Sequence, residues 1–131
     1  MLFSQNNPQL NAYKAAQIES NTSVSNSFEL ILLLHSKLLE HIGTLELCLK
    51  NGDLAKKQVV VGKMVEILSA LDASLELDSG NELVQNIHDL YIFCITKTTE
   101  ISVKKDLNEL DSLKRIVQDL KDGWEGMMEH L

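Results

Sequence analysis

Proline is almost absent from this chain: Pro8 is the only one, so residues 9–131 contain none. Proline breaks helix interiors and interrupts strands, and a proline-free stretch of this length favours long helices. Aromatic residues are also scarce, at 5 %, whereas strands are typically enriched in them. A leucine-rich chain of 131 residues with these two deficits is predicted to form one all-α domain.

Positive charge is scarce as well. Aspartate and glutamate outnumber lysine and arginine by 19 to 12, which gives a formal net charge of −7, and Arg115 is the only arginine. Nucleic-acid-binding proteins need a basic face, and phosphate-clamping sites typically use arginine. The charge balance therefore argues against nucleic acid as a partner.

Cysteines are few, and the sequence shows neither a leader segment nor a long apolar run. Cys48 and Cys94 are too few for a disulfide framework, and both lie in apolar runs typical of buried thiols in a reducing compartment. The first eight residues have neither a charged start nor a long apolar core. Apolar runs such as Leu30–Leu34 are far too short to span a bilayer. We therefore expect a cytoplasmic protein with no membrane insertion.

Motifs for catalysis and metal binding are missing. The chain contains no Gly-x-x-x-x-Gly-Lys phosphate loop and no Gly-x-Ser-x-Gly nucleophile elbow. None of its four histidines follows a glutamate at the spacing of di-metal sites in helical bundles. We expect no enzyme, no catalytic residue, no metal and no cofactor. Phosphate transfer through His35 or His41, near Lys37 and Gly43, stays open as a weaker alternative.

Apolar residues recur every three or four positions over four stretches, which predicts four amphipathic helices. The stretches lie near 27–50, 54–77, 81–102 and 106–125. Asn26 with Glu29, and Asp106 with Glu109, have the spacing of N-terminal capping boxes. Because the joints are short, consecutive helices should be antiparallel neighbours. The expected architecture is an antiparallel up-down four-helix bundle over residues 27–131.

Residues 1–26 differ from the rest of the chain. They are rich in Asn, Ser and Gln, and they contain the isolated apolar residues Leu10, Tyr13, Ile18 and Val24. We expect a mobile N-terminal arm, or a short extra helix near Asn11–Glu19. Leu10 and Tyr13 could then form a removable lid over a vacant groove of the bundle.

Several apolar residues fall outside the predicted helix stripes, including Leu32, Leu33 and Leu47 on the first long helix and Ile92 and Phe93 on the third. Apolar residues that a bundle cannot bury are candidates for a partner-binding groove. The same excess would also arise if these helices were simply more central. The sequence leaves both interpretations open.

A series of short motifs, in fixed order and spacing, runs along the chain. The motifs are Asn11-Ala12-Tyr13, Leu30-Ile31 with Leu34, Gly52-Asp53, Ser79-Gly80-Asn81-Glu82-Leu83-Val84-Gln85-Asn86-Ile87, Leu90-Tyr91 and Trp124. Together they resemble the FliS family of flagellin export chaperones over about residues 10–125. The resemblance implies the same antiparallel helical bundle.

The resemblance also implies a function. Members of this family bind the disordered C-terminal segment of flagellin in the cytoplasm, keep it from polymerising early and hold it ready for the export apparatus. Export-apparatus components or a co-chaperone are further candidate partners. With helical phase as the guide, the predicted partner-binding residues lie on the arm and on the first three long helices. They are Leu10, Tyr13, Ile18, Leu34, Leu38, Leu68, Leu71, Leu75, Leu90, Tyr91 and Ile95.

The sequence departs from the family pattern in three places. Ser25-Asn26-Ser27 stands where the family commonly has Ala-Ser-Pro, Ile92-Phe93 where it often has Asp-Tyr, and Ile101-Ser102 where it has Ala-Asn. The last two changes make the third helix more apolar and bear on which flagellin is recognised. A helical adaptor for another export or signalling partner, and a self-assembling structural subunit, remain as alternatives.

Overall fold

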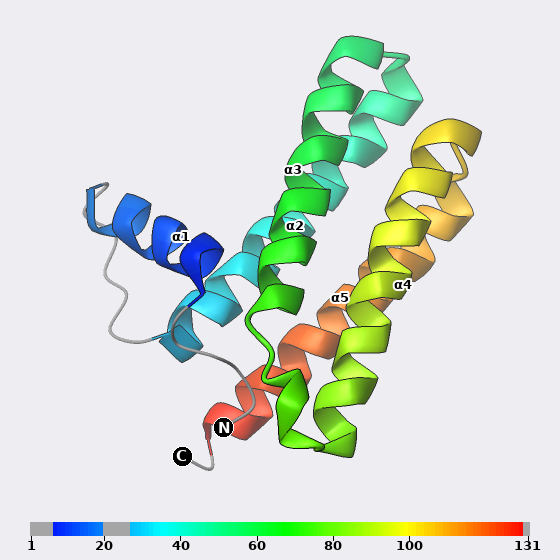
Figure 1. Cartoon of the computed structure of the whole chain (residues 1–131). Helices are drawn as coiled ribbons and strands as arrows, with labels where there is room; N and C mark the ends of the chain where they lie inside the picture. The colour runs from blue at the N-terminus through cyan, green and yellow to red at the C-terminus, as the bar shows by residue number, and fades with distance from the viewer. Residues whose placement is uncertain (1–6, 20–26, 130–131) are drawn as a thin grey trace.

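The computed structural model describes residues 7–19 and 27–129, and over these ranges the chain is helical without a strand (Figure 1). The elements are α1 (Pro8–Glu19), α2 (Ser27–Asn51), α3 (Leu54–Ala73), the 3-10 turn η1 (Leu77–Ser79), α4 (Glu82–Lys104) and α5 (Leu107–Met128). The prediction of an all-α fold is confirmed.

Helices α2 to α5 form an antiparallel bundle in which each helix packs against its neighbours in the chain and α5 packs back against α2 (Figure 1). The contact between α4 and α5 is the least extensive of these four. The additional helix α1 rests on α2 and α3. One side of the ring is therefore more open than the others, and it is the side away from α1.

Short polar side chains start three of these helices. Asp53 accepts a hydrogen bond from the backbone N–H of Lys56, and Asn81 accepts one from the backbone N–H of Leu83. Asp106 accepts bonds from the N–H groups of Asn108 and Glu109. These caps satisfy N–H groups that have no partner within the helix. Gly52 and Gly80 have φ values of 70° and 69°, the left-handed conformation that glycine adopts at low cost.

Three helix ends differ from the sequence-based expectation by three or four residues, and one of them is the end of α5, at Met128 instead of near residue 125. Helix α3 ends at Ala73, four residues before Leu77, and the Ser74 hydroxyl donates a 2.6 Å hydrogen bond to the carbonyl of Leu71 at this end. Helix α1 begins at Pro8, before Asn11, because Asn7 accepts a bond from the N–H of Gln9 and proline is favoured in the first helical turn. Of the arm predicted over 1–26, residues 1–6 and 20–26 lie outside the described part, as does the expected cap Asn26.

The core is formed by apolar residues on the inward faces of all four bundle helices. Its largest fully buried side chains are Trp124 and Tyr91, and the Trp124 ring meets Phe28 edge-on with 5.5 Å between ring centroids. Leu32 and Leu33 are partly buried against this core, whereas Leu47 is exposed. The apolar excess of α2 is thus largely absorbed by packing.

Polar contacts also tie α4 to α3 at both ends of the pair. The half-buried His88 and Asp72 lie 2.6 Å apart, Nδ1 to Oδ1. At the other end, the buried Lys57 ammonium donates a 2.9 Å bond to the backbone carbonyl of Ser102, in the last turn of α4. A cation at a helix C-terminus is favourable because the carbonyls there carry partial negative charge.

Candidate partner-binding groove

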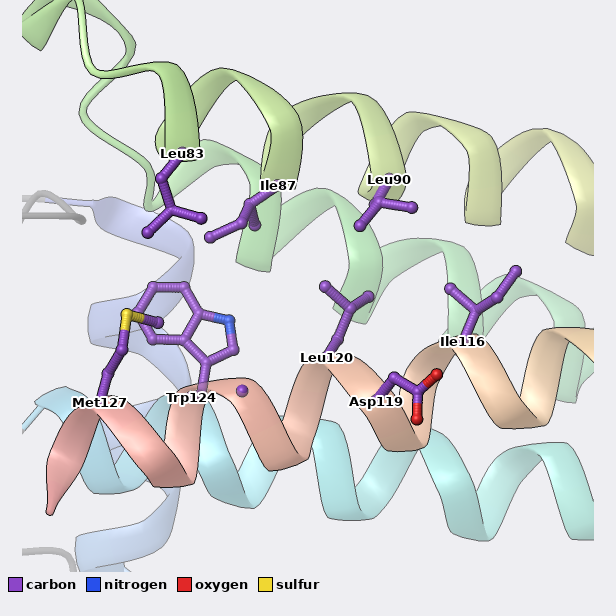
Figure 2. Close-up of a pocket in the computed structure, with 9 residues that line it drawn as sticks. Leu83, Ile87, Leu90, Ile116, Asp119, Leu120, Trp124 and Met127 are labelled. Atoms are coloured by element: carbon purple, nitrogen blue, oxygen red, sulfur yellow. The ribbon is translucent and has the colours of Figure 1, made fainter.

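A groove runs between α4 and α5, where the bundle is least tightly closed (Figure 2). It encloses about 370 Å³. Its lining is apolar except for one carboxylate. The lining residues are Leu83, Ile87 and Leu90 from α4, and Ile116, Asp119, Leu120, Gly123, Trp124 and Met127 from α5.

The groove has a buried floor and exposed leucines at its rim. Ile87, Leu120 and Trp124 are buried, whereas Leu83 and Leu90 on α4 retain 48 % and 40 % of their exposure. Figure 2 shows the α4 side chains pointing toward those of α5 across the gap. Removing apolar surface of this kind from water is favourable, so the groove offers a free-energy gain to a partner that covers it.

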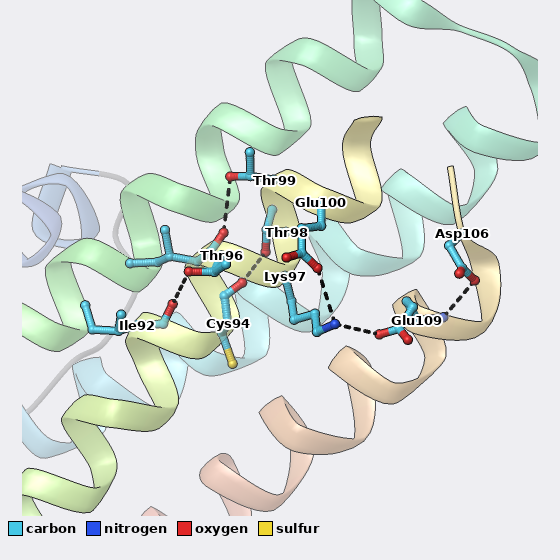
Figure 3. Close-up of polar contacts among 10 residues, drawn as sticks. Ile92, Cys94, Thr96, Lys97, Thr98, Thr99, Glu100, Asp106 and Glu109 are labelled. Atoms are coloured by element: carbon cyan, nitrogen blue, oxygen red, sulfur yellow. Dashed lines mark hydrogen bonds and ion pairs between the residues drawn. The ribbon is translucent and has the colours of Figure 1, made fainter. Parts of the chain in front are cut away.

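An ion-pair cluster joins α4 and α5 beyond one end of the groove (Figure 3). The Lys97 ammonium lies 3.3 Å from the Glu100 carboxylate on its own helix and 3.2 Å from Glu109 on α5. It also lies 5.7 Å from the centroid of the Phe93 ring. Hydrogen bonds to Glu109 and Glu100 raise the pKa of Lys97, so this contact stays charged at neutral pH.

A buried hydrogen-bonded chain supports the floor from behind. The Trp124 indole N–H donates to the Tyr91 hydroxyl at 2.9 Å, and this hydroxyl lies 2.9 Å from His35 Nε2. His35 Nδ1 lies 2.7 Å from the Ile31 carbonyl. Since a carbonyl only accepts, Nδ1 carries the imidazole proton and Nε2 accepts from Tyr91. The chain links α5, α4 and α2 and fixes the Trp124 ring at the groove floor.

Burial keeps this chain neutral. Loss of solvation lowers the pKa of His35 to about 4, although the bond to the Ile31 carbonyl acts in the opposite direction. Burial likewise raises the pKa of Tyr91 well above its usual range. Because His35 is buried and both of its ring nitrogens are engaged, it presents no nitrogen to a phosphate donor. The phosphotransfer alternative through His35 therefore has no structural support.

The predicted partner-binding residues fall into several environments. Leu90 lines the groove, Tyr91 lies directly behind its floor, and Ile95 is partly buried against the core. Six others are buried in the core and do not face solvent. They were selected by helical phase, and helical phase identifies the inward face of a helix. These six are Leu10, Leu34, Leu38, Leu68, Leu71 and Leu75.

The arm residues lie on a different surface from the groove. Leu10 is buried and the Asn7 side chain donates a 3.1 Å bond to the Ala70 carbonyl, which seats α1 on α3. Tyr13 is partly buried beside Glu66. Its pKa is raised mainly by burial and, to a smaller extent, by the negative charge of Glu66. The side chain of Ile18 is outside the described part. None of the described side chains of α1 lines the α4–α5 groove, and α1 contacts α2 and α3, so a lid formed by it would cover those two helices instead.

Sequence reasoning missed most of the groove. Leu83, Ile87 and Trp124 occur in the short motifs of the sequence but not among its predicted partner-binding residues, and neither do Ile116, Leu120 and Met127. A usable signal was present on the last helix, where Ile116, Leu120, Gly123 and Met127 follow one another at helical spacing beside the core stripe. This second stripe widens the apolar face of α5 toward α4.

Neither a metal site nor a membrane span is found in the described ranges. Across residues 7–19 and 27–129, no three His, Cys, Asp or Glu side chains come together as metal ligands. Within the same ranges, no helix combines the length and the hydrophobicity that crossing a membrane requires.

Comparison with known proteins identifies relatives over most of the chain. A family model described as "Flagellar protein FliS" matches residues 9–131. The chain is 28 % identical to the flagellar secretion chaperone FliSB of Pseudomonas aeruginosa over 115 residues, covering 88 % of this chain and 91 % of that protein. It is 24 % identical to the flagellar secretion chaperone FliS of Vibrio cholerae over 116 residues, covering 88 % and 85 %. A bacterial flagellar chaperone of known crystal structure matches the fold with a TM-score of 0.74 at 20 % identity, over 95 % of this chain and all of that one.

Proposed function

The chain belongs to the family of the flagellar protein FliS, and from this premise we propose that it binds the disordered C-terminal segment of flagellin through the α4–α5 groove. Its curated relatives are named as secretion chaperones, not as enzymes, and a role in flagellar export follows from the family. Flagellin as the client is the proposal. The observation that carries it is the open apolar groove with two exposed leucines at its rim.

The groove suits a short amphipathic helix. Its α5 wall extends from Ile116 to Met127, about 16 Å along the helix axis, which is the length of roughly three turns. A client segment with apolar residues at i, i+3 or i+4, and i+7 would place one stripe along this wall. Each large apolar side chain that becomes buried contributes roughly 1.5 to 3 kcal/mol.

Binding of this kind couples folding of the client to its capture. A disordered segment loses conformational entropy when it becomes helical, which lowers its affinity for a given buried area. A moderate affinity suits a chaperone that prevents early polymerisation and then delivers its client to the export apparatus. Delivery involves export-apparatus components or a co-chaperone as further partners. The buried free thiols of Cys48 and Cys94 are consistent with action in the reducing cytoplasm.

Calorimetric titration with a peptide comprising the C-terminal segment of flagellin tests the proposal. We expect one peptide per chain, a gain of helical circular dichroism and a negative heat-capacity change. Trp124 is the only tryptophan and lies on the groove floor, so its fluorescence should also change on binding. Lack of binding to any flagellin of the same organism would rule out flagellin as the client.

A pair of variants separates the groove from the rest of the surface. Leu90→Asp places a charge at the rim and should abolish or strongly weaken binding. Leu54→Asp changes a leucine of α3 that is also exposed, at 56 %, and does not line the groove, so it should bind as the wild type does. Equal affinities for both variants would place the client on another surface, such as the one beneath α1.

A further inference from the structure

Among the residues that the structure describes, Asp119 is the only charged one that lines the α4–α5 groove (Figure 2). It lies on the α5 wall between Ile116 and Leu120, with Gly123 about one turn further along the helix (Figure 2). Its side chain is exposed in the free protein, so water solvates the carboxylate there. A helix that filled the groove would remove part of this water.

Neighbouring charged residues of α5 already have partners, whereas Asp119 has none among the described residues. Arg115 lies 2.8 Å from Asp111, and Lys121 lies 3.2 Å from Glu125. The Asp122 carboxylate accepts a 2.9 Å bond from the Gln118 amide. Those three contacts lie within α5 and leave Asp119 free to interact with a molecule in the groove.

Covering an unpaired carboxylate is unfavourable unless the covering molecule supplies a cation or a hydrogen-bond donor. A purely apolar client helix would lose part of its binding free energy at Asp119, and an acidic one would lose more. A lysine or arginine beside the apolar stripe would instead form a charge-assisted hydrogen bond in a partly shielded site. Asp119 therefore discriminates between clients that have equally good apolar stripes.

The charge pattern also decides between possible occupants. A second copy of this chain would bring a formal net charge of −7 to a chain that already carries −7, so the two copies would repel one another. The segments outside the described ranges, residues 1–6, 20–26 and 130–131, contain no lysine or arginine. These segments therefore offer Asp119 no lysine or arginine, which favours a cation supplied by another molecule.

We infer that Asp119 is a specificity-determining residue of the groove, which selects an amphipathic client helix carrying a lysine or arginine next to its apolar stripe. The inference rests on the proposed function, since it concerns the same groove and the same client. It adds that one basic residue of the client fixes the register in which the helix docks. It also adds that binding weakens as salt concentration rises.

The test compares Asp119→Asn and Asp119→Lys with a control, Asp122→Asn, on the same helix. Asp122 is exposed, lies three residues after Asp119 and does not line the groove. Affinity for the flagellin C-terminal peptide is measured at low and high salt. We expect Asp119→Asn to bind roughly three- to tenfold more weakly at low salt, as for a partly shielded ion pair, and to lose much of the salt dependence. Asp122→Asn should match the wild type.

Charge reversal identifies the partner residue. Peptides in which each lysine or arginine is replaced by glutamate, one at a time, are titrated against the wild type and Asp119→Lys. One replacement should weaken binding to the wild type and restore binding to Asp119→Lys. Peptide binding that is unchanged in both Asp119 variants, or that no single replacement restores, overturns the inference while the proposed function stands. No binding by the wild-type protein overturns the proposed function and the inference with it.

Discussion

His35 lies in the middle of the chain that joins three helices behind the groove, and its neutral form is part of the fold. Protonation at Nε2 would turn an acceptor into a donor that faces the Tyr91 hydroxyl. The Tyr91 oxygen already accepts from Trp124, so its own proton would lose its partner. A histidine that looks like a reactive group in the sequence is therefore a buried structural residue.

This arrangement predicts a loss of stability in mild acid. The folded-state pKa of His35 is about 4, because burial disfavours the cation, whereas an unfolded histidine titrates near 6.5. The contribution to stability is complete above pH 6.5. It falls as the pH drops from 6.5 to 4, because only the unfolded chain takes up the proton, and it is constant below pH 4. The expected loss is about 3 kcal/mol, measured by urea unfolding at a series of pH values.

A direct titration provides the control. The imidazole signal of His35, followed by nuclear magnetic resonance, should have its midpoint near pH 4 in the folded protein. His41 is only partly buried, and His41→Gln should retain most of the acid destabilisation. A midpoint for His35 near that of a free histidine would contradict the explanation.

At the scale of the helices, the sequence predicts what depends on near neighbours in the chain. Asp106 with Glu109 correctly marks the start of α5, and the apolar stripes correctly identify the inward faces. The groove depends instead on how closely α4 and α5 approach one another. Ile87 and Leu90 are three residues apart on one face, yet Ile87 is buried and Leu90 is exposed. Periodicity gives the direction of a side chain and leaves the distance to the opposite helix undetermined.

Gly123 gives a prediction for α5. Glycine inside a helix is less favourable than alanine by about 1 kcal/mol. No heavy atom lies within 4 Å of the position that a Cβ atom would occupy at Gly123, so Gly123→Ala should stabilise the protein by about this amount in urea unfolding. The new methyl group would lie on the groove wall. It should weaken binding of the flagellin peptide, because it blocks close approach of the client backbone.

The matched control for this variant lies on α3. Gly62 is also an exposed helical glycine with nothing within 4 Å of a Cβ, and it does not line the groove. Gly62→Ala should therefore stabilise the protein without changing peptide affinity. If Gly123→Ala stabilises the protein and leaves the affinity unchanged, the client does not pack against this turn of α5.

At the scale of the whole molecule, the helix α1 and the groove occupy different helix pairs. Helix α1 rests on α2 and α3, and the groove opens between α4 and α5 (Figure 1). The charge balance of the sequence argues against nucleic acid as a partner and its short apolar runs argue against membrane insertion, while the order of the short motifs indicates the family. Neither could place the client, because the groove is formed by side chains from segments more than twenty residues apart.

The proposed capture of flagellin in the α4–α5 groove makes a prediction about filament growth. If it sequesters free flagellin one to one, the final filament mass should fall in proportion to the molar ratio of chaperone to flagellin and approach zero near equimolar amounts. Sedimentation of filaments grown from seeds measures this mass. Leu90→Asp should lose the effect and Leu54→Asp should keep it, since only the first changes the groove. Arrest of growth by a small fraction of an equivalent would show that the protein acts on filament ends, because sequestration cannot stop growth while free monomer remains.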